Sequence, residues 1–185
     1  MSLPTTPYGI ATYYLIATAE ASSNLARYDG VKYGYRSSQR EDLLEMYCQT
    51  RKEGFGTEAK RRIMLGTYAL SAGYYDAYYT KAQKVRRMIQ EKTLDILNEY
   101  DYILLPSTPG TAPEIGEKIN DPIAMYLEDI FTVQANLTGM PAISLPLGQH
   151  SNGLPFGVQL ITGKMKEDSL LAISCYLMKI TSRNR

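Results

Sequence analysis

The pattern of apolar residues changes near residue 100, and this change constrains the fold more than any other feature. Before it, apolar residues recur every three or four positions, which is the spacing of one helix face. After it, short apolar runs end at proline or glycine, which is typical of strands. The sequence therefore predicts an α/β chain in which helices pack on a short mixed β-sheet. The first helical set is Ile10, Tyr14, Ala17, Ala21 and Leu25.

Four helices are expected before residue 100. The first should span about residues 10–26, with a turn at Asp29–Gly30 after it. Each later helix has its own start signal. These signals are a capping box of Ser37 or Ser38 with Glu41, a cap at Thr57, and Gly73 before a long helix that reaches about residue 97.

Three strands and two helices are expected in the second half. The run 102–105 reads as a buried strand that Pro106 ends, and 142–147 with 156–161 read as two strands of a hairpin. A long loop, 106–122, leads to a helix that should begin at Asp121–Pro122 and continue to about residue 137. A last helix is expected over about 168–180. We expect a single domain over residues 4–185.

Composition excludes several classes of function. Twenty lysines and arginines against nineteen acidic residues give a formal charge of +1, which disfavours direct binding to nucleic acid. Two cysteines and one histidine suit neither a disulfide framework nor a histidine-rich metal site. The start of the chain lacks the pattern of a secretory signal, and no apolar run is long enough to span a membrane. We therefore expect a soluble, cytoplasmic protein with no membrane contact.

Two charged pairs could bind an amino acid. Arg61–Arg62 could supply a fork-shaped cation for an α-carboxylate, and Glu128–Asp129 an anion for an ammonium group. Taken alone, each pair is more simply a solvated helix face. No set of nucleophile and base is complete in this sequence. The sixteen tyrosines suit ordinary packing or a subunit boundary.

Several longer segments carry a resemblance to a known family. The chain closely resembles the C-terminal portion of the amidase signature family, from about Tyr8 to Ile180. Within it, the first and third segments below look like the A subunits of aspartyl/glutamyl-tRNA amidotransferases. The segments are Glu20–Gly30, Glu53–Gly56, Lys60–Gly66, Gly73–Tyr79, Lys81–Arg86, Pro106–Pro109, Asn136–Pro141 and Gly153–Gly157.

The resemblance implies a glutaminase. Such A subunits release ammonia from glutamine, and a partner subunit uses it with ATP and magnesium to amidate glutamate or aspartate misacylated on tRNA. The implied partners are glutamine and the B and C subunits of the amidotransferase, with tRNA reached only through the B subunit. The family uses a Ser-cis-Ser-Lys triad that this sequence does not contain, so the isolated chain is expected to be inactive and to need no cofactor of its own.

The resemblance also implies a substrate pocket. Arg62 matches the arginine that binds the glutamine α-carboxylate, although Arg61 is possible in a shifted register. Asp129 matches the aspartate that binds the α-amino group, and Tyr13 matches a tyrosine that lines the pocket. Two alternatives stay open at this point. One is another amidase-signature hydrolase with an apolar pocket for small amides, and the other is a non-catalytic module that binds partner subunits through its tyrosine-rich helices and the 106–122 loop.

Overall fold

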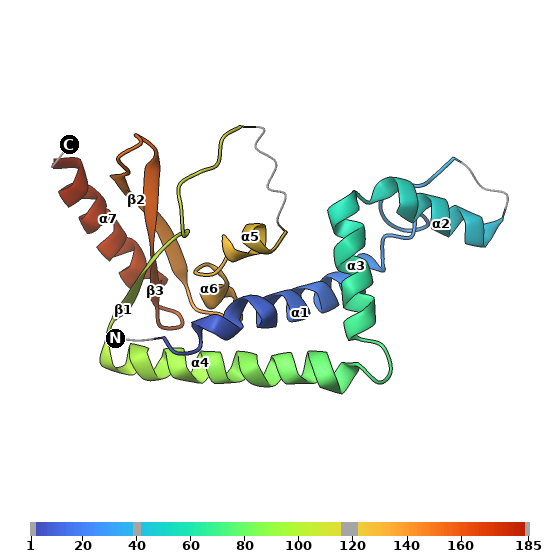
Figure 1. Ribbon diagram of the computed structural model, residues 1–185, viewed down its shortest axis with the longest axis horizontal. Helices are drawn as coiled ribbons and strands as arrows, with labels where there is room; N and C mark the ends of the chain where they lie inside the picture. The colour runs from blue at the N-terminus through green and yellow to red at the C-terminus, as the bar shows by residue number, and fades with distance from the viewer. Residues whose placement is uncertain (1–2, 39–41, 116–121, 184–185) are drawn as a thin grey trace. The chain divides into compact units, whose positions relative to one another are not determined.

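The computed structural model describes residues 3–38, 42–115 and 122–183 (Figure 1). The chain forms two compact units. We call Met1–Tyr13 with Lys84–Arg185 the sheet unit, and Tyr14–Gln83 the helical unit. Each unit is described by itself. The expectation of a single domain over residues 4–185 stays a prediction.

The helical unit is built on α1 (Thr6–Leu25), which begins in the sheet unit, and on α3 (Thr57–Ala69). Both helices were expected, and α1 begins four residues earlier than the spacing indicated. Gly66 of α3 faces α1 so closely that a Cβ atom there would lie 1.9 Å from the carbonyl oxygen of Thr18. One residue further, the hydroxyls of Thr67 and Ser22 lie 2.8 Å apart. A glycine and a hydroxyl pair therefore set the approach of the two helices.

The helix α2 (Leu43–Gly54) begins later than the sequence indicated. Its N-cap is Asp42, whose carboxylate accepts the backbone N–H of Glu45 at 2.7 Å. The serine at 37 serves tertiary contacts instead, since its backbone N–H donates to Thr50 Oγ1 and its hydroxyl to Glu53. The predicted partner Glu41 lies outside the described residues.

The segment after Gly73 is not a regular α-helix at its start. Tyr75–Thr80 forms a π-helix, η1, and α4 (Lys81–Glu99) follows it. Tyrosine rings pair across this segment, with centroids 5.2 Å apart for Tyr75 and Tyr79.

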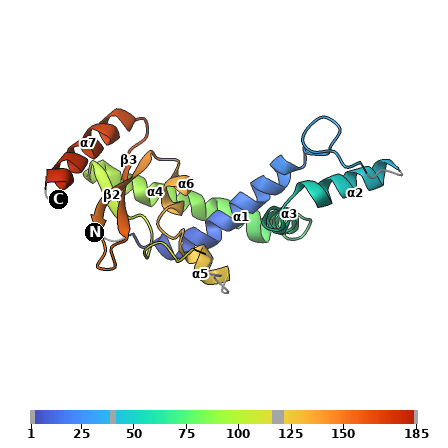
Figure 2. The same ribbon diagram turned by 90° about the horizontal axis from the view of Figure 1, so that it is seen from above.

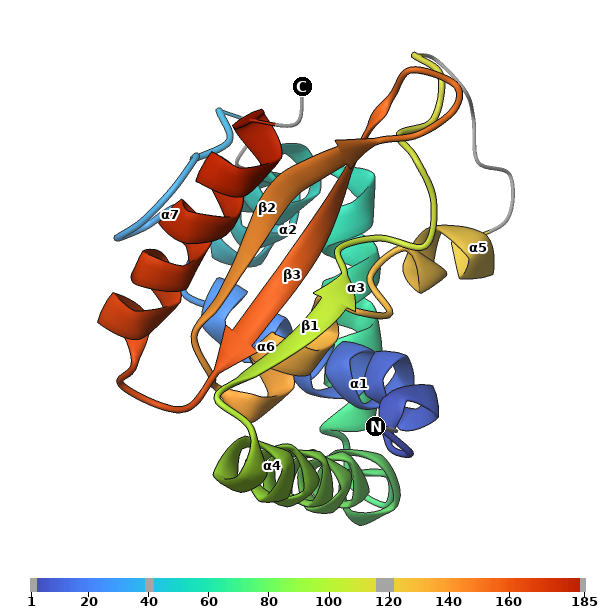
Figure 3. The same cartoon turned by 90° about the vertical axis from the view of Figure 1, so that its left-hand side faces the viewer.

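The sheet unit has three strands in the order β1-β3-β2: β1 (Tyr102–Pro106), β2 (Ala142–Gln149) and β3 (Pro155–Thr162) (Figure 3). The predicted hairpin of β2 and β3 is confirmed, and so is the α/β class. The described sheet is antiparallel throughout rather than mixed. The hairpin makes β2 and β3 antiparallel, and β1 pairs with the other edge of β3. The two strands that share a direction, β1 and β2, are therefore not neighbours.

Large apolar side chains cover both faces of this sheet. Successive residues of a strand point to opposite faces. Leu160 and Ile161 of β3 therefore belong to two separate hydrophobic clusters. Leu160 packs with Leu145 and with Leu170 of α7 (Glu167–Arg183), and α7 lies along the sheet (Figure 2). Ile161 packs with Ile103 and Met140, and the end of α4 covers them through Leu94, Ile96 and Leu97.

The helix predicted over 122–137 is broken into α5 (Pro122–Leu127) and α6 (Val133–Thr138). The connecting turn is tied to the sheet, because the side-chain amide of Gln159 donates to the carbonyl oxygen of Phe131 at 3.0 Å. That bond comes from β3, and no local signal in the sequence marks it. The predicted cap Asp121 lies outside the described residues.

The far end of the hairpin has an irregular register between Leu145 and Gly148. Pro146 lies in this interval and cannot donate a backbone hydrogen bond. Across the hairpin, the ring of Phe156 lies over Gly148, where an added Cβ would be 2.1 Å from Phe156 Cζ. The aromatic ring therefore occupies the space that a side chain at position 148 would need.

The described part of the chain gives no sign of a disulfide, a membrane-spanning helix or a cluster of metal ligands. Cys48 of α2 and Cys175 of α7 are both exposed, and neither forms a disulfide with another described residue. No helix in residues 3–38, 42–115 or 122–183 has the length and apolar character to cross a membrane. No group of three or more His, Cys, Asp or Glu side chains in those ranges could hold a metal ion.

Candidate functional site

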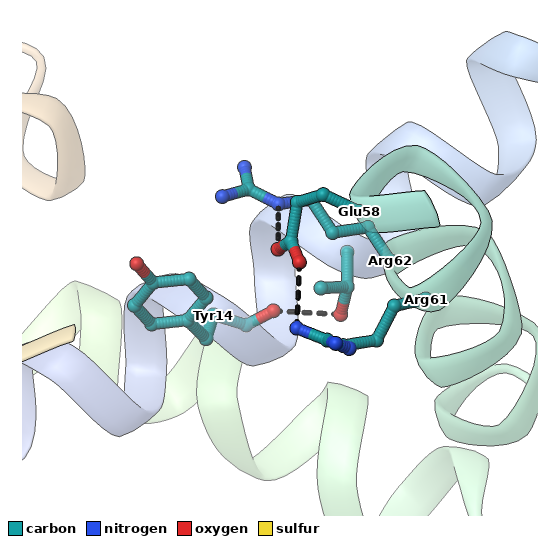
Figure 4. A network of polar contacts seen from close by, with 5 residues as sticks. Tyr14, Glu58, Arg61 and Arg62 are labelled. Carbon is teal, nitrogen blue, oxygen red and sulfur yellow. Dashed lines mark hydrogen bonds and ion pairs between the residues drawn. The ribbon is translucent and has the colours of Figure 1, made fainter. Parts of the chain in front are cut away.

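Arg62 is held in place by two neighbours in the helical unit (Figure 4). Its Nε–H donates to Glu58 Oε1 at 3.0 Å, one turn earlier in α3. Its guanidinium carbon lies 5.8 Å from the centroid of the Tyr14 ring, which α1 supplies. A cation at this distance from a ring face is attracted by the electron density of the ring. The guanidinium is thus fixed at one edge and supported on one face.

The carboxylate of Glu58 also binds the neighbouring arginine. Its second oxygen, Oε2, accepts from Arg61 Nη1 at 2.8 Å. The two arginines therefore share one carboxylate through different oxygens (Figure 4). We call Tyr14, Glu58, Arg61 and Arg62 the guanidinium cluster. Of its two arginines, Arg62 is the one for which a contact with the Tyr14 ring is found.

The packing of α3 on α1 explains why Arg62 meets Tyr14. Residues four apart lie on one helix face. Arg62 lies one turn before Gly66, and Tyr14 lies one turn before Thr18, whose carbonyl Gly66 approaches. The hydroxyl of Thr18 in turn donates to the carbonyl oxygen of Tyr14 at 2.6 Å. The close helix contact at Gly66 therefore sets the ring and the guanidinium against each other one turn away.

The charges of the cluster suit a carboxylate ligand. Two guanidinium groups and one carboxylate leave one excess positive charge. The side chains of Arg62 and Glu58 are 41% and 43% exposed. Water therefore screens their ion pair, and dissolved molecules can reach the cluster. A guanidinium offers parallel N–H donors that match the two oxygens of a carboxylate. The cluster can therefore bind a carboxylate-bearing molecule.

Asp129 lies in the sheet unit, in the turn between α5 and α6 rather than within a helix. Its backbone N–H donates to the carbonyl oxygen of Tyr126 at 3.2 Å. Its own carbonyl oxygen accepts from the N–H of Val133 at 3.1 Å and from the hydroxyl of Thr132 at 3.1 Å. The backbone of this half-buried aspartate is thus fixed on both sides. A carboxylate on such a turn can pair with an ammonium group.

Tyr13 is the third predicted residue, and it lies in α1 as a partly buried residue of the sheet unit. Of the three predicted residues, Arg62 belongs to the helical unit, and Tyr13 and Asp129 belong to the sheet unit. Inside the helical unit, Arg62 is brought together with Tyr14 and Glu58, which sequence reasoning did not select. The i,i+4 spacing of Glu58 and Arg62 was a usable signal. No local signal marks Tyr14, because its contact joins two distant helices.

Two cavities of the described residues do not include the predicted site residues in their lining. One of about 260 Å³ lies in the sheet unit beside the Asp129 turn, and the hydroxyl of Thr6 and the amide of Gln134 are its polar side chains. Thr6 donates to Leu3, and Gln134 donates to Thr93, so both polar groups already have partners. The lining carries no charge and does not suit an amino-acid head group. The second, of about 250 Å³ in the helical unit, is lined by Ala19, Glu20, Ser23, Asn24, Leu70, Tyr75 and Tyr79.

Comparison with known proteins gives relatives of high identity. The A subunit of glutamyl-tRNA(Gln) amidotransferase from Thermodesulfovibrio yellowstonii is 59% identical over 174 residues, which cover 94% of this chain and 36% of that protein. The protein of the same name from Pelagibacter ubique is 57% identical over 187 residues, covering 100% of this chain and 38% of its own length. The chain therefore spans little more than a third of the length of these relatives.

Solved structures agree with this result. The crystal structure of the glutamyl-tRNA(Gln) amidotransferase A subunit from Thermotoga maritima matches with a TM-score of 0.60 and 48% identity, over 89% of this chain and 30% of that one. A crystal structure described as an amidase matches with a TM-score of 0.69 at 21% identity, over 96% of this chain and 36% of that one, and supports the fold alone. The family model described as Amidase matches residues 1–171. The chain therefore belongs to the amidase family.

Proposed function

We propose that this chain is part of the A subunit of a glutamine-dependent tRNA amidotransferase and that it binds the charged head group of glutamine. The observation that carries the proposal is the guanidinium of Arg62, held by Glu58 over Tyr14. Support also comes from relatives, 57–59% identical, that are named as the A subunit of glutamyl-tRNA(Gln) amidotransferase.

In this proposal, Arg62 binds the α-carboxylate of glutamine, Asp129 pairs with its ammonium group, and Tyr13 lines the pocket. The arrangement selects by charge. An amide that lacks either charge would leave a charged side chain of the protein without its partner, and an unpaired charge in a site costs more binding energy than a missing apolar contact. The two charged residues thus select a free amino acid from other small amides.

The rest of the reaction belongs to the larger assembly. In this proposal, the serines and lysine of the hydrolytic triad lie in a part of the subunit that this sequence does not span. Ammonia from glutamine would be used with ATP and magnesium at the B subunit to amidate Glu-tRNA(Gln) or Asp-tRNA(Asn), in a cytoplasmic complex that includes the C subunit. We expect no sustained release of ammonia when the isolated chain is incubated with glutamine. Release above the buffer rate would contradict this division of roles.

Arg62→Lys in a complete subunit that contains this chain tests the carboxylate role. Lysine keeps the charge but loses the fork of parallel donors. We expect the KM for glutamine to rise about tenfold to a hundredfold. Arg87→Lys, at an exposed arginine of α4, is the matched control and should change KM less than twofold. Arg61→Lys tests the alternative register. A larger effect at position 61 than at position 62 would move the carboxylate ligand to Arg61.

Two substrate analogues separate the roles of Arg62 and Asp129. The compound 4-aminobutanamide is glutamine without its α-carboxylate, and glutaramate is glutamine without its α-amino group. Arg62→Lys should impair glutamine and glutaramate but leave the slow turnover of 4-aminobutanamide nearly unchanged. Asp129→Asn should impair glutamine and 4-aminobutanamide but spare glutaramate. Equal losses on all three amides would show that these residues support the structure rather than bind the head group.

A further inference from the structure

We propose that Glu58 is a positioning residue that sets the orientation of the Arg62 guanidinium for a substrate carboxylate. This inference rests on the proposed function, in which Arg62 binds the α-carboxylate of glutamine. It adds to that function a residue which does not itself touch substrate.

Two contacts of Arg62 fit this role, one at Nε and one at a face of the guanidinium. Glu58 Oε1 accepts from Nε, which lies on the side of the group nearest its aliphatic chain. The ring of Tyr14 supports one face. A carboxylate that approaches end-on is bound by the two terminal nitrogens, so the same guanidinium can hold Glu58 and the substrate together.

Glu58 is itself held from a second direction. Oε2 accepts from Arg61, so the carboxylate is bound at both oxygens by neighbours on the same helix. A carboxylate bound at only one oxygen could rotate and release Arg62. We therefore infer that Arg61 acts on Arg62 indirectly, by fixing Glu58, and that the paired arginines of the sequence have different roles.

The expected benefit is an arginine that is ordered before substrate arrives. An arginine side chain has many rotamers, and binding must otherwise restrict them. An arginine fixed beforehand avoids that loss, which corresponds to about a threefold to tenfold gain in affinity for one long side chain. Exposed ion pairs on a helix contribute little to stability. Replacing Glu58 should therefore affect binding while leaving α3 folded.

The test is Glu58→Ala in the complete subunit, with glutamine and 4-aminobutanamide as substrates. The KM for glutamine should rise threefold to tenfold, and kcat should change less than twofold. The KM for 4-aminobutanamide should not change, because it has no carboxylate for Arg62 to bind. Glu58→Gln keeps one acceptor oxygen and should recover part of the loss. Arg61→Ala should raise the KM for glutamine twofold to threefold.

Glu91→Ala provides a matched control. Arg87 Nε and Glu91 Oε1 form an ion pair at 2.9 Å with the same i,i+4 spacing and the same arginine nitrogen, but on α4. Removing Glu91 should leave both substrates unaffected. If Glu58→Ala and Glu91→Ala give equal changes, the effect belongs to exposed ion pairs in general and the inference is wrong.

The outcomes separate the inference from the proposed function. If Arg62→Lys leaves the KM for glutamine unchanged, the proposed role of Arg62 fails and the inference fails with it. If Arg62→Lys raises KM but Glu58→Ala does not, the proposed function stands and only the positioning role is overturned. Equal losses of Glu58→Ala on both substrates would overturn it as a structural effect. A lower KM for glutamine would also overturn it, because Glu58 would then compete with the substrate.

Discussion

The two units bury different kinds of side chain. The buried apolar residues of the sheet unit are large, and they are Ile89, Ile103, Val133, Leu137, Met140, Leu145, Leu160, Ile161 and Leu170. Those of the helical unit are Ile16, Met46 and three alanines at positions 19, 69 and 82. Several large apolar side chains of the helical unit are instead exposed, including Leu44 and Met64, at 71% and 73%.

This difference indicates that different interactions stabilise the packing of the sheet unit and of the helical unit. In the sheet unit, burial of large side chains against both sheet faces supplies the main stabilisation. In the helical unit, close backbone approach at Gly66 and side-chain hydrogen bonds such as Ser37 to Glu53 define the geometry. The helical unit should therefore respond most to changes in small and polar residues, and the sheet unit to the loss of apolar volume.

Ile161→Ala should have the largest effect, because Ile161 is fully buried on β3. Deleting a buried isoleucine to alanine loses transfer free energy and leaves a cavity, which together cost about 4 kcal/mol. Hydrogen exchange read by mass spectrometry should show faster exchange in the β1, β2 and β3 peptides. Exchange in α3 should stay unchanged. Equal acceleration of exchange in both units would mean that they unfold together. This result would contradict the claim that different interactions stabilise the two units.

Gly66→Ala should be nearly as severe and should act in the other unit. An added Cβ would meet the backbone carbonyl of Thr18, which no side-chain rotation can relieve. We expect a cost of about 2–3 kcal/mol from the forced separation of α1 and α3, measured by urea unfolding. Gly110→Ala is the control, since its Cβ would meet nothing within 4 Å. A loss of less than about 0.5 kcal/mol for Gly66→Ala, the range of ordinary surface changes, would show that the helices are not held by this contact.

The smallest expected effect concerns the exposed tyrosines of the helical unit. A hydrogen bond to Tyr74, with smaller effects of burial and of Tyr78, raises the pKa of Tyr68 to about 12. The ordinary tyrosine pKa is about 10. Because the folded-state pKa is the higher one, this contribution to stability is fully present below about pH 10 and is lost as the pH rises toward 12.

Absorbance at 295 nm provides the measurement. The titration of Tyr68 is the difference between the parent chain and Tyr68→Phe, and its midpoint should lie near pH 12. The same difference in a Tyr74→Phe background should have a lower midpoint, nearer to 10. An unchanged midpoint would mean that the hydrogen bond to Tyr74 does not hold the Tyr68 proton.

The elements that could be predicted from the sequence are those with local causes. The helices α1, α3 and α7 follow from apolar periodicity, and the β2–β3 hairpin follows from two apolar runs around a polar turn. The start of α2 was misplaced because Ser37 bonds to Glu53, a residue on the helix that it was expected to cap. The turn between α5 and α6, where a continuous helix was expected, accepts a hydrogen bond from Gln159 of β3 at Phe131. In both places the structure has hydrogen bonds between residues distant in the sequence, which local patterns do not reveal.

The candidate site likewise contains residues that local patterns can indicate and residues that only tertiary packing brings in. The residues Arg62, Asp129 and Tyr13 came from the resemblance of whole segments, and their roles stay predictions. Periodicity could have indicated Glu58, since it lies one turn before Arg62 on the same helix. Tyr14 could not be found in this way. Its contact with Arg62 depends on how α1 and α3 pack, and that packing depends on the absence of a side chain at Gly66.

The hairpin contact between Gly148 and Phe156 places a constraint on how this chain can evolve. With the ring of Phe156 over the backbone, any side chain at position 148 needs a smaller neighbour at position 156. A change at one site alone would open or overfill the end of the hairpin, whereas a paired change could preserve it. Among relatives, these two positions should therefore co-vary, with glycine at one accompanying an aromatic residue at the other.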